Sequence, residues 1–373
     1  MTKHWGLPSI LALLFLVVPL RAQFDRAQPT WDGEGKGVEY FRQSWRVLEP
    51  VSYRNLSIYP VVSEVKAASS DFLTLDEGIA SGSVRIAERG EVENALYRRR
   101  DTEPWPGARE AWPPRGGASV NELVLVNNSG RPLLLLAGEV VWGGKQNRII
   151  GSDLVVPPKS DPVPLTVFCV EHGRWTAGGG TFDSARAMAH PKIRQEAQVS
   201  RSQEGVWESV ARAAAGLRAA SPTSSYLDVL NSPEAKRKMD AAASSLEADY
   251  ERELREKLAG RGAVGVVVAI NGELVWSDVF TSPDLFRKYW PKLLRSYVIE
   301  AEGQARDAKG LPSTKDAQAF LREDHGRVTI KEEPGAYRRT EISARDYQLV
   351  ALEALGKYGD TGLLVHYNKM ARD

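Results

Sequence analysis

Polar and charged side chains interrupt a series of short apolar segments between Ala137 and Trp175. A buried charge is costly unless it is paired, so side chains of this kind are usually retained for a specific role. Two carboxylates, Glu139 and Glu171, are the candidates for catalysis. The candidate ligand-binding residues are Gln146, Asn147, Arg148, Asp153, Arg174 and Trp175. This stretch, called the polar block below, predicts a site but does not specify a reaction.

The types of these residues indicate the chemistry of a ligand. Side chains alternate along a strand, which places Gln146 and Arg148 on one face. If Glu171 converges on that face, the guanidinium could hold an anionic group bidentately while the neighbouring amides donate hydrogen bonds. Trp175 could then stack on a flat ring. We therefore predict that the polar block binds a small anionic or nucleotide-like ligand, or a protein partner.

Two other interpretations of the polar block are open. In the first, the protein hydrolyses a nucleotide-like or ADP-ribose-linked substrate, with Glu139 and Glu171 as a carboxylate pair and the arginines on the phosphate. Glycosidic chemistry of this kind requires carboxylates about 5–9.5 Å apart. In the second, a buried ion pair and amide hydrogen bonds only hold two strands in register.

Several common kinds of catalytic centre are not indicated. Cys169 is the only cysteine, so the chain forms no internal disulfide, and we interpret this residue as a buried, unreactive thiol. The four histidines beyond the first 22 residues lack H-x-H or H-E-x-x-H spacing, so we predict no metal centre. Gly143-Gly144-Lys145 is followed by Gln146 instead of Ser or Thr, which argues against a phosphate-binding loop. No cofactor is predicted.

The first 22 residues have the layout of a secretory signal peptide. A basic start precedes the apolar run Leu7–Leu20, and the small residue Ala22 precedes Gln23. The run is shorter than the roughly 18 residues expected of a membrane helix. We predict cleavage before Gln23 and a secreted or periplasmic protein without stable membrane insertion, with an uncleaved anchor as the alternative because Arg21 is unfavourable for processing. The net charge of +1 argues against nucleic acid as a partner.

Short strand-like runs dominate the chain from Leu56 to the end of the polar block. Asn121–Val126 and Pro132–Ala137 flank the sequence Asn-Asn-Ser-Gly, which predicts a hairpin. The intervals between successive runs leave no room for crossover helices. The strands are therefore predicted to be antiparallel, in a sheet or a barrel-like sandwich.

After the polar block, the amino-acid composition becomes typical of helices. Helical composition extends from Phe182 to Leu217 and again from Ser232 to Leu258, where Ser232 and Pro233 supply an N-cap and a first-turn proline. Asn271-Gly272 predicts a type I′ hairpin turn within Ala263–Phe280. Tyr347–Leu355 fits either a helix or a strand.

These patterns predict an α+β protein with an antiparallel sheet or barrel-like core, a long helical insertion and a second β-hairpin unit. The predicted organisation is a signal peptide over 1–22, a polar leader over 23–46 and one domain over 47–373, which is β-rich over 47–175, helical over 182–259 and composed of a hairpin plus helices over 263–373.

Three segments of the polar block resemble a known family. The sequences G-E-V-V-W-G-G-K-Q-N-R, D-L-V-V-P-P and F-C-V-E-H-G-R-W occur in this order between Gly138 and Trp175. They are similar to the ARPP-1 family, the "ARG and Rhodanese-Phosphatase-superfamily-associated" proteins, formerly a domain of unknown function. The resemblance implies an association with ADP-ribosylglycohydrolases and rhodanese-like phosphatases. It implies no established reaction.

Overall fold

A computed structural model describes residues 44–64, 71–88, 122–173, 180–219, 221–258, 262–304, 310–359 and 362–372, without the side chains of 250, 251 and 253–258. The predicted signal peptide, Arg174 and Trp175 lie outside these ranges. Helices and largely antiparallel sheets make up the described chain, which confirms the α+β class. Within these residues, no helix combines the length and the apolar character that are needed to cross a bilayer.

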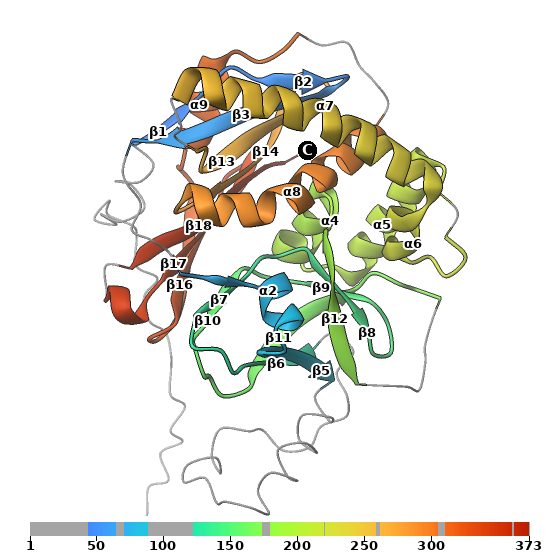
Figure 1. The fold of residues 1–373 in the computed structure, drawn as a ribbon, viewed down its shortest axis with the longest axis vertical. Coiled ribbons are helices and arrows are strands. Elements are labelled where there is room, and N and C mark those ends of the chain that lie inside the picture. Colours follow the sequence, from blue (N-terminus) through green and yellow to red (C-terminus); the bar gives the residue numbers. More distant parts are fainter. Residues whose placement is uncertain are drawn as a thin grey trace, which may run out of the picture.

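The largest sheet has nine strands in the order β1-β3-β13-β14-β18-β17-β16-β15, with β2 paired to β3 (Figure 1). Its strands are β1 (Trp45–Val47), β2 (Val51–Tyr53), β3 (Leu56–Ser63), β13 (Gly265–Ile270), β14 (Glu273–Phe280), β15 (Arg327–Glu333), β16 (Tyr337–Ser343), β17 (Tyr347–Ala354) and β18 (Leu363–Ala371). Asn271 and Gly272 join β13 to β14 with φ of 53° and 79°, which confirms the predicted type I′ turn. The segment that fitted either helix or strand is the strand β17.

A closed six-stranded barrel lies beside this sheet. Its strands are β5 (Val84–Glu88), β6 (Glu122–Asn127), β8 (Glu139–Gly143), β9 (Arg148–Ile150), β11 (Val163–Cys169) and β12 (Thr181–Met188). A small three-stranded sheet accompanies it and contains β4 (Leu73–Thr74), β7 (Leu133–Leu135) and β10 (Leu154–Val156). The barrel confirms the predicted barrel-like core.

The predicted hairpin between β6 and β7 is wrong. β6 pairs with β5 on one edge and β11 on the other, so the barrel leaves it no edge for β7, which pairs with β10 and β4 instead. The buried amide of Asn127 stabilises the connection, because its Nδ2 donates to the carbonyls of Arg131 and Pro157, both at 3.0 Å. The turn therefore connects two sheets.

The helices are α2 (Leu75–Ala80), α4 (Pro191–Gln195), a π-helical turn (Glu196–Ser200), α5 (Gln203–Leu217), α6 (Tyr226–Asn231), α7 (Pro233–Leu258), α8 (Pro283–Gly303), α9 (Thr314–Arg322) and a 3₁₀ turn (Gly356–Tyr358). The prediction of helix from Ser232 to Leu258 is confirmed, and the Ser232 hydroxyl accepts a hydrogen bond from the Ala235 N–H. The prediction of helix from Phe182 is wrong over its first part. Pairing with β5 and β8 makes Thr181–Met188 a strand despite its helix-forming alanines.

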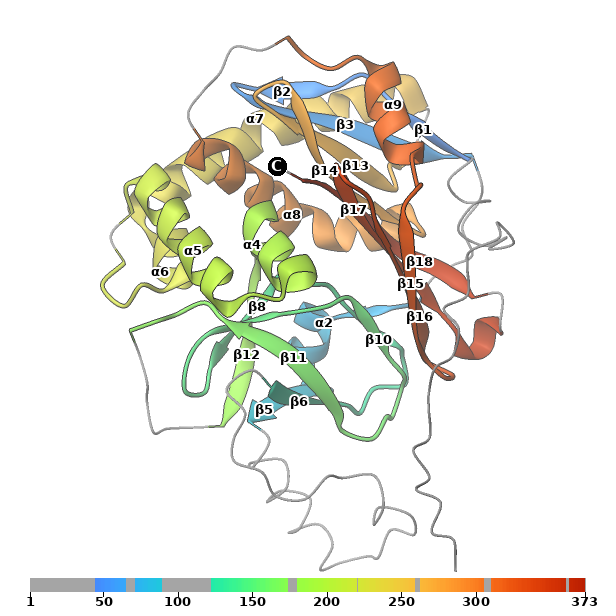
Figure 2. The same cartoon turned by 180° about the vertical axis from the view of Figure 1, so that it is seen from behind.

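Helix α8 lies between the large sheet and the barrel, while α9 covers the opposite face of the sheet (Figures 1 and 2). Three apolar clusters follow from this arrangement. One fills the space between the sheet and helices α5–α8, one lies beneath α9, and one fills the barrel. Lys292 of α8 lies close to the barrel and pairs there with Glu139 of β8 and Asp76 of α2.

Candidate functional site

The structure divides the polar block into three groups, and the first contains Gln146, Asn147, Arg148 and Glu171. Arg148 Nη1 lies 3.4 Å from Gln146 Oε1 and 3.3 Å from the Asn147 carbonyl. Glu171 accepts hydrogen bonds from the Asn147 N–H at 3.1 Å and the Thr223 hydroxyl at 3.2 Å. All four polar-block side chains are buried. These contacts tie the segment before α6 to strands β9 and β11.

Asp153 belongs to a second group, a fully buried ion cluster around Asp278. Arg194 from α4 binds both oxygens of Asp278, at 2.8 and 2.9 Å. His366 from β18 bridges the two carboxylates, with Nε2 3.0 Å from Asp278 and Nδ1 2.7 Å from Asp153. Asp153 also accepts the Ala137 N–H at 2.7 Å. The cluster joins the barrel side of the protein to the large sheet.

The charges in this ion cluster compensate one another. Burial disfavours the imidazolium of His366, but Asp153 and Asp278 outweigh burial and raise its pKa to about 9. Burial likewise opposes ionisation of Asp278, yet Arg194 and His366 hold its pKa well below the ordinary value. Two cations therefore face two carboxylates. Such a balanced, hydrogen-bonded arrangement is what allows charges to be buried.

Glu139 lies in a third group, around Lys292 of α8. Lys292 Nζ lies 2.5 Å from Glu139 Oε1 and 2.9 Å from Asp76 Oδ2. Burial lowers the pKa of Lys292, but the two carboxylates more than offset this effect and keep the ammonium protonated. The other oxygen of Glu139 accepts the Leu136 N–H at 2.8 Å. The structure therefore does not place Glu139 in the group that contains Glu171.

Lys292 also forms part of the wall of a cavity with a volume of about 220 Å³. The residues that line it, from β12 and helices α6, α7 and α8, are Ala185, Arg186, Ala187, Met188, Leu227, Leu230, Asn231, Lys236, Met239, Lys292, Arg295 and Ile299. Four of these described lining residues are cationic and none is acidic. We call this space the basic cavity.

Arg186 reaches the basic cavity from an irregular part of β12. The pairing of β12 with β8 shifts register between Ser184 and Met188, and Arg186 adopts φ of 51°, a left-handed conformation that is unfavourable for residues other than glycine. The Ser184 hydroxyl accepts the Arg186 N–H at 3.0 Å and donates to Asp76 at 2.5 Å. The bulge is therefore connected to the Lys292 group by hydrogen bonds.

The cationic residues of this cavity carry little signal in the amino-acid sequence. Lys292 carried a weak signal, because it is a charge between apolar positions of α8 and is followed by Arg295 one helical turn later. Arg186 carried none, since a bulge is not visible in a single sequence. Arg174 and Trp175 of the predicted site cannot be placed, because they lie outside the described residues.

The model of the ARPP-1 family, described as "ARG and Rhodanese-Phosphatase-superfamily-associated Protein domain", matches residues 44–368. The chain belongs to the ARPP-1 family. No curated protein and no solved structure matches it. The match begins before β1 and includes most of β18, so the ARPP-1 domain comprises the large sheet, the barrel, the intervening helices and all residues of the basic cavity.

Proposed function

We propose that this ARPP-1 protein binds a small anionic ligand in the basic cavity. The observation that carries the proposal is the set of four cationic side chains that line it without an acidic neighbour in the lining. Neither Arg186 nor Lys236 forms a direct ion pair among the described residues, although Asp76 attracts Arg186 electrostatically, and both are exposed at the cavity. A phosphate or carboxylate would pair directly with both cations.

The size of the basic cavity limits the part of the ligand that enters it. Pockets for drug-sized molecules usually measure about 300–1,000 Å³, whereas this one measures about 220 Å³. One phosphoryl or carboxylate group with a short attached body fits this volume. Leu230, Met239 and Ile299 provide apolar surface for that body. A larger nucleotide-like ligand would extend outwards past Arg186 and Lys236.

Binding is favoured over hydrolysis by the surroundings of the two candidate carboxylates. Glu139 is engaged by Lys292, and Glu171 is engaged by Asn147 and Thr223. The two carboxylates share no hydrogen-bond partner among the described residues. A carboxylate pair that acts on one glycosidic bond must instead flank a common space.

Ligand binding is tested by calorimetric titration with inorganic phosphate, ribose 5-phosphate and ADP-ribose. Arg186→Gly should weaken binding about tenfold or more, because a hydrogen bond to a charged group contributes about 1.5–3 kcal/mol. Arg218→Gly is the matched control, since Arg218 has a φ of 52° and is exposed away from this cavity. Equal affinities of the two variants, or no binding to the unmodified protein, would contradict the proposal.

A second pair of variants tests the contribution of α7. Lys236→Gln should also weaken binding, whereas Arg237→Gln should not, because Arg237 is the next residue of the helix and pairs with Glu234 outside the cavity. Equal weakening of binding by both substitutions would indicate that affinity depends only on the overall charge of the surface, which would contradict a role for Lys236 in the cavity.

We also propose that the protein binds its ligand outside the cytoplasm, since the apolar run Leu7–Leu20 has the length of a signal peptide. Mass spectrometry of the protein from its own host is expected to find Gln23 at the N-terminus. An intact Met1 would contradict both cleavage and this part of the proposal.

A further inference from the structure

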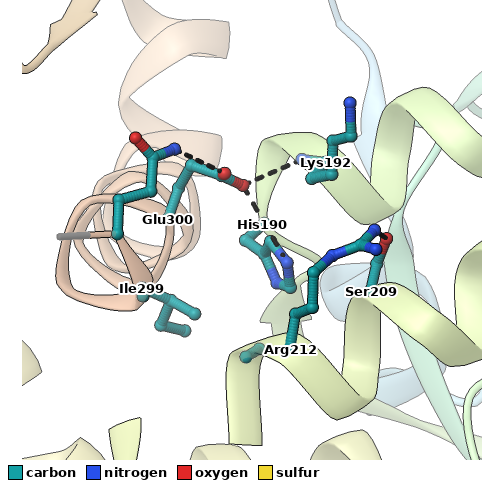
Figure 3. A pocket seen from close by; sticks show the side chains of 9 residues that line it. His190, Lys192, Ser209, Arg212, Ile299 and Glu300 are labelled. Atoms are coloured by element: carbon teal, nitrogen blue, oxygen red, sulfur yellow. Dashed lines mark hydrogen bonds and ion pairs between the residues drawn. The ribbon is translucent and has the colours of Figure 1, made fainter. Parts of the chain in front are cut away.

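A second cavity, with a volume of about 240 Å³, lies where the start of α4 meets α5 and the C-terminal part of α8 (Figure 3). Its lining consists of His190, Lys192, Ser209, Arg212, Ala213, Ile299, Glu300, Gly303 and Gln304. Only Ile299 is shared with the basic cavity. The two cavities therefore present different chemical groups. We call the second one the histidine cavity.

The imidazole of His190 is held in one orientation by Tyr226. His190 is only 4% exposed, and its Nδ1 lies 3.1 Å from the Tyr226 hydroxyl. The same hydroxyl accepts the backbone N–H of His190 at 3.1 Å. We assign His190 to the tautomer in which this hydroxyl donates to Nδ1, so that the ring proton resides on Nε2. Burial lowers the pKa of His190, which keeps the ring neutral near pH 7.

The Nε2 atom of His190 faces Glu300 without a hydrogen bond between them. The distance from Nε2 to Glu300 Oε2 is 3.9 Å, which is too long for a direct hydrogen bond. Glu300 is fixed in place, because it accepts the Lys192 N–H at 2.9 Å and the Gln304 side-chain amide at 3.0 Å. A donor and an acceptor thus stand side by side at the cavity wall. An oxygen that accepts from Nε2 and donates to the carboxylate, as a hydroxyl does, satisfies both.

Arg212 supplies a positive charge to the same cavity. Its guanidinium donates to the Ser209 hydroxyl at 2.8 Å. Figure 3 shows the Arg212 side chain next to His190. Its ion pair with Glu208 is long, at 3.7 Å, and both side chains are more than half exposed. Exposed pairs of this kind contribute little to stability and are screened by salt. Arg212 can therefore bind an anionic group of a ligand.

We propose that the histidine cavity is a second binding site, for a small hydroxylated anion such as a hydroxycarboxylate or a sugar phosphate. The ligand hydroxyl lies between His190 Nε2 and Glu300, and its anionic group lies on Arg212. This site is independent of the one in the basic cavity, because it depends on different side chains. The two classes of ligand share the hydroxyl and the negative charge and differ in the anionic group.

Paired probes that differ only in the hydroxyl test this assignment. Titrations compare lactate with propionate, and glycerol 3-phosphate with propyl phosphate. We expect the hydroxylated member of at least one pair to bind about tenfold more tightly than its partner, since its hydroxyl occupies a charged hydrogen-bonding position. The pair that shows the preference identifies the anionic group. Lack of a hydroxyl preference in both pairs would overturn the proposal.

Variants assign the binding to this cavity. His190→Phe should remove the hydroxyl preference, and Arg212→Gln should weaken both members of the preferred pair. Arg218 is exposed and directly follows α5, so Arg218→Gln should leave affinity unchanged. Loss of the same binding in Arg186→Gly but not in Arg212→Gln would place the probe in the basic cavity and overturn the proposal.

NMR provides a readout that does not depend on the folding of a variant. The ¹⁵N signals of the His190 ring in the unmodified protein should report a neutral imidazole with its proton on Nε2. The preferred probe should shift the Nε2 signal, and an unperturbed ring at saturating probe would contradict direct binding there.

Discussion

The ion cluster around Asp278 and the basic cavity use the same kinds of side chain and differ in how the charges are satisfied. In the cluster, Arg194 and His366 are enclosed and face carboxylates at hydrogen-bonding distance. In the cavity, Arg186 and Lys236 are exposed and have no ion-pair partner in the described part of the chain. The comparison indicates that residue type alone does not identify a binding site. Solvent access and the lack of a direct ion pair are the features by which we propose the cavity as a binding site.

The paired charges around Lys292 explain how an accessible charge of the basic cavity can be positioned. Asp76 binds Lys292 and accepts from Ser184, whose hydroxyl in turn holds the Arg186 N–H. Paired charges thus support the bulge that presents Arg186. Substitutions can separate the structural contribution of the enclosed charges from the binding contribution of the exposed ones.

The largest effect is expected from Arg194→Met. This change leaves Asp278 buried without its bidentate partner and should lower the free energy of unfolding by about 3–5 kcal/mol. Arg295→Met in the basic cavity is the control, because Arg295 and Asp240 form an exposed pair that contributes at most about 1 kcal/mol. Urea unfolding of both variants measures the difference. Similar losses would remove the distinction between the two regions.

The ion cluster should also make stability depend on pH. The folded-state pKa of His366 is raised from 6.5 to about 9, so its stabilisation is complete below pH 6.5 and is lost as the pH rises through about 9. The loss is expected to be on the order of 3 kcal/mol. Urea unfolding across this range should show the decline, and His366→Gln should abolish that part of it. An unchanged pH dependence in the variant would assign the effect to other groups.

Substitution of Cys169 tests whether its buried, uncharged thiol contributes only to packing. The side chain is 1% exposed, and burial raises the pKa of its thiol. Cys169→Ala should cost about 1 kcal/mol of unfolding free energy and leave ligand binding intact. A thiol reagent should label the unfolded but not the native protein. Rapid native labelling, or loss of binding at unchanged stability, would show a functional thiol.

The smallest effect on stability is expected from Arg186→Gly. Glycine adopts a φ of 51° without strain, so the free energy of unfolding should stay the same or rise by up to about 1 kcal/mol. Arg218→Gly should behave similarly in thermal and urea unfolding. A residue that weakens ligand binding when it is removed, yet does not stabilise the fold, is retained for binding. Marked destabilisation by Arg186→Gly alone would instead make its side chain structural.

Elements with strong local signals were predictable from the sequence. Asn271-Gly272 defined a turn because both residues tolerate positive φ, and Ser232-Pro233 defined the start of α7 through capping. The strand Thr181–Met188 was not predictable, because its pairing with β5 and β8 outweighs local helix preference. The pairing of β6 was missed for a related reason. Barrel closure determines which edges are occupied, and no local pattern contains that information.

The site was less predictable than the fold. The polar block was correctly read as a stretch of unusual charges on apolar strands, but neighbouring positions need not share partners. Glu139 points to Lys292 and Asp153 to His366, whereas Arg148 and Glu171 remain near Asn147. The partners Lys292 and His366 come from α8 and β18, far along the chain. Only the tertiary structure identifies such contacts.

The pairing of β3 with β13 has a consequence for the order in which the protein assembles. Val61 lies opposite Gly265, and the chain between these two strands contains the whole barrel and the helices α2, α4, α5, α6 and α7. Closing so long a segment is entropically costly, and folding dominated by such distant contacts is slow. The barrel strands are much closer to one another in sequence. We therefore expect the barrel to close first and to bring β3 and β13 together, so that the large sheet is completed late in folding.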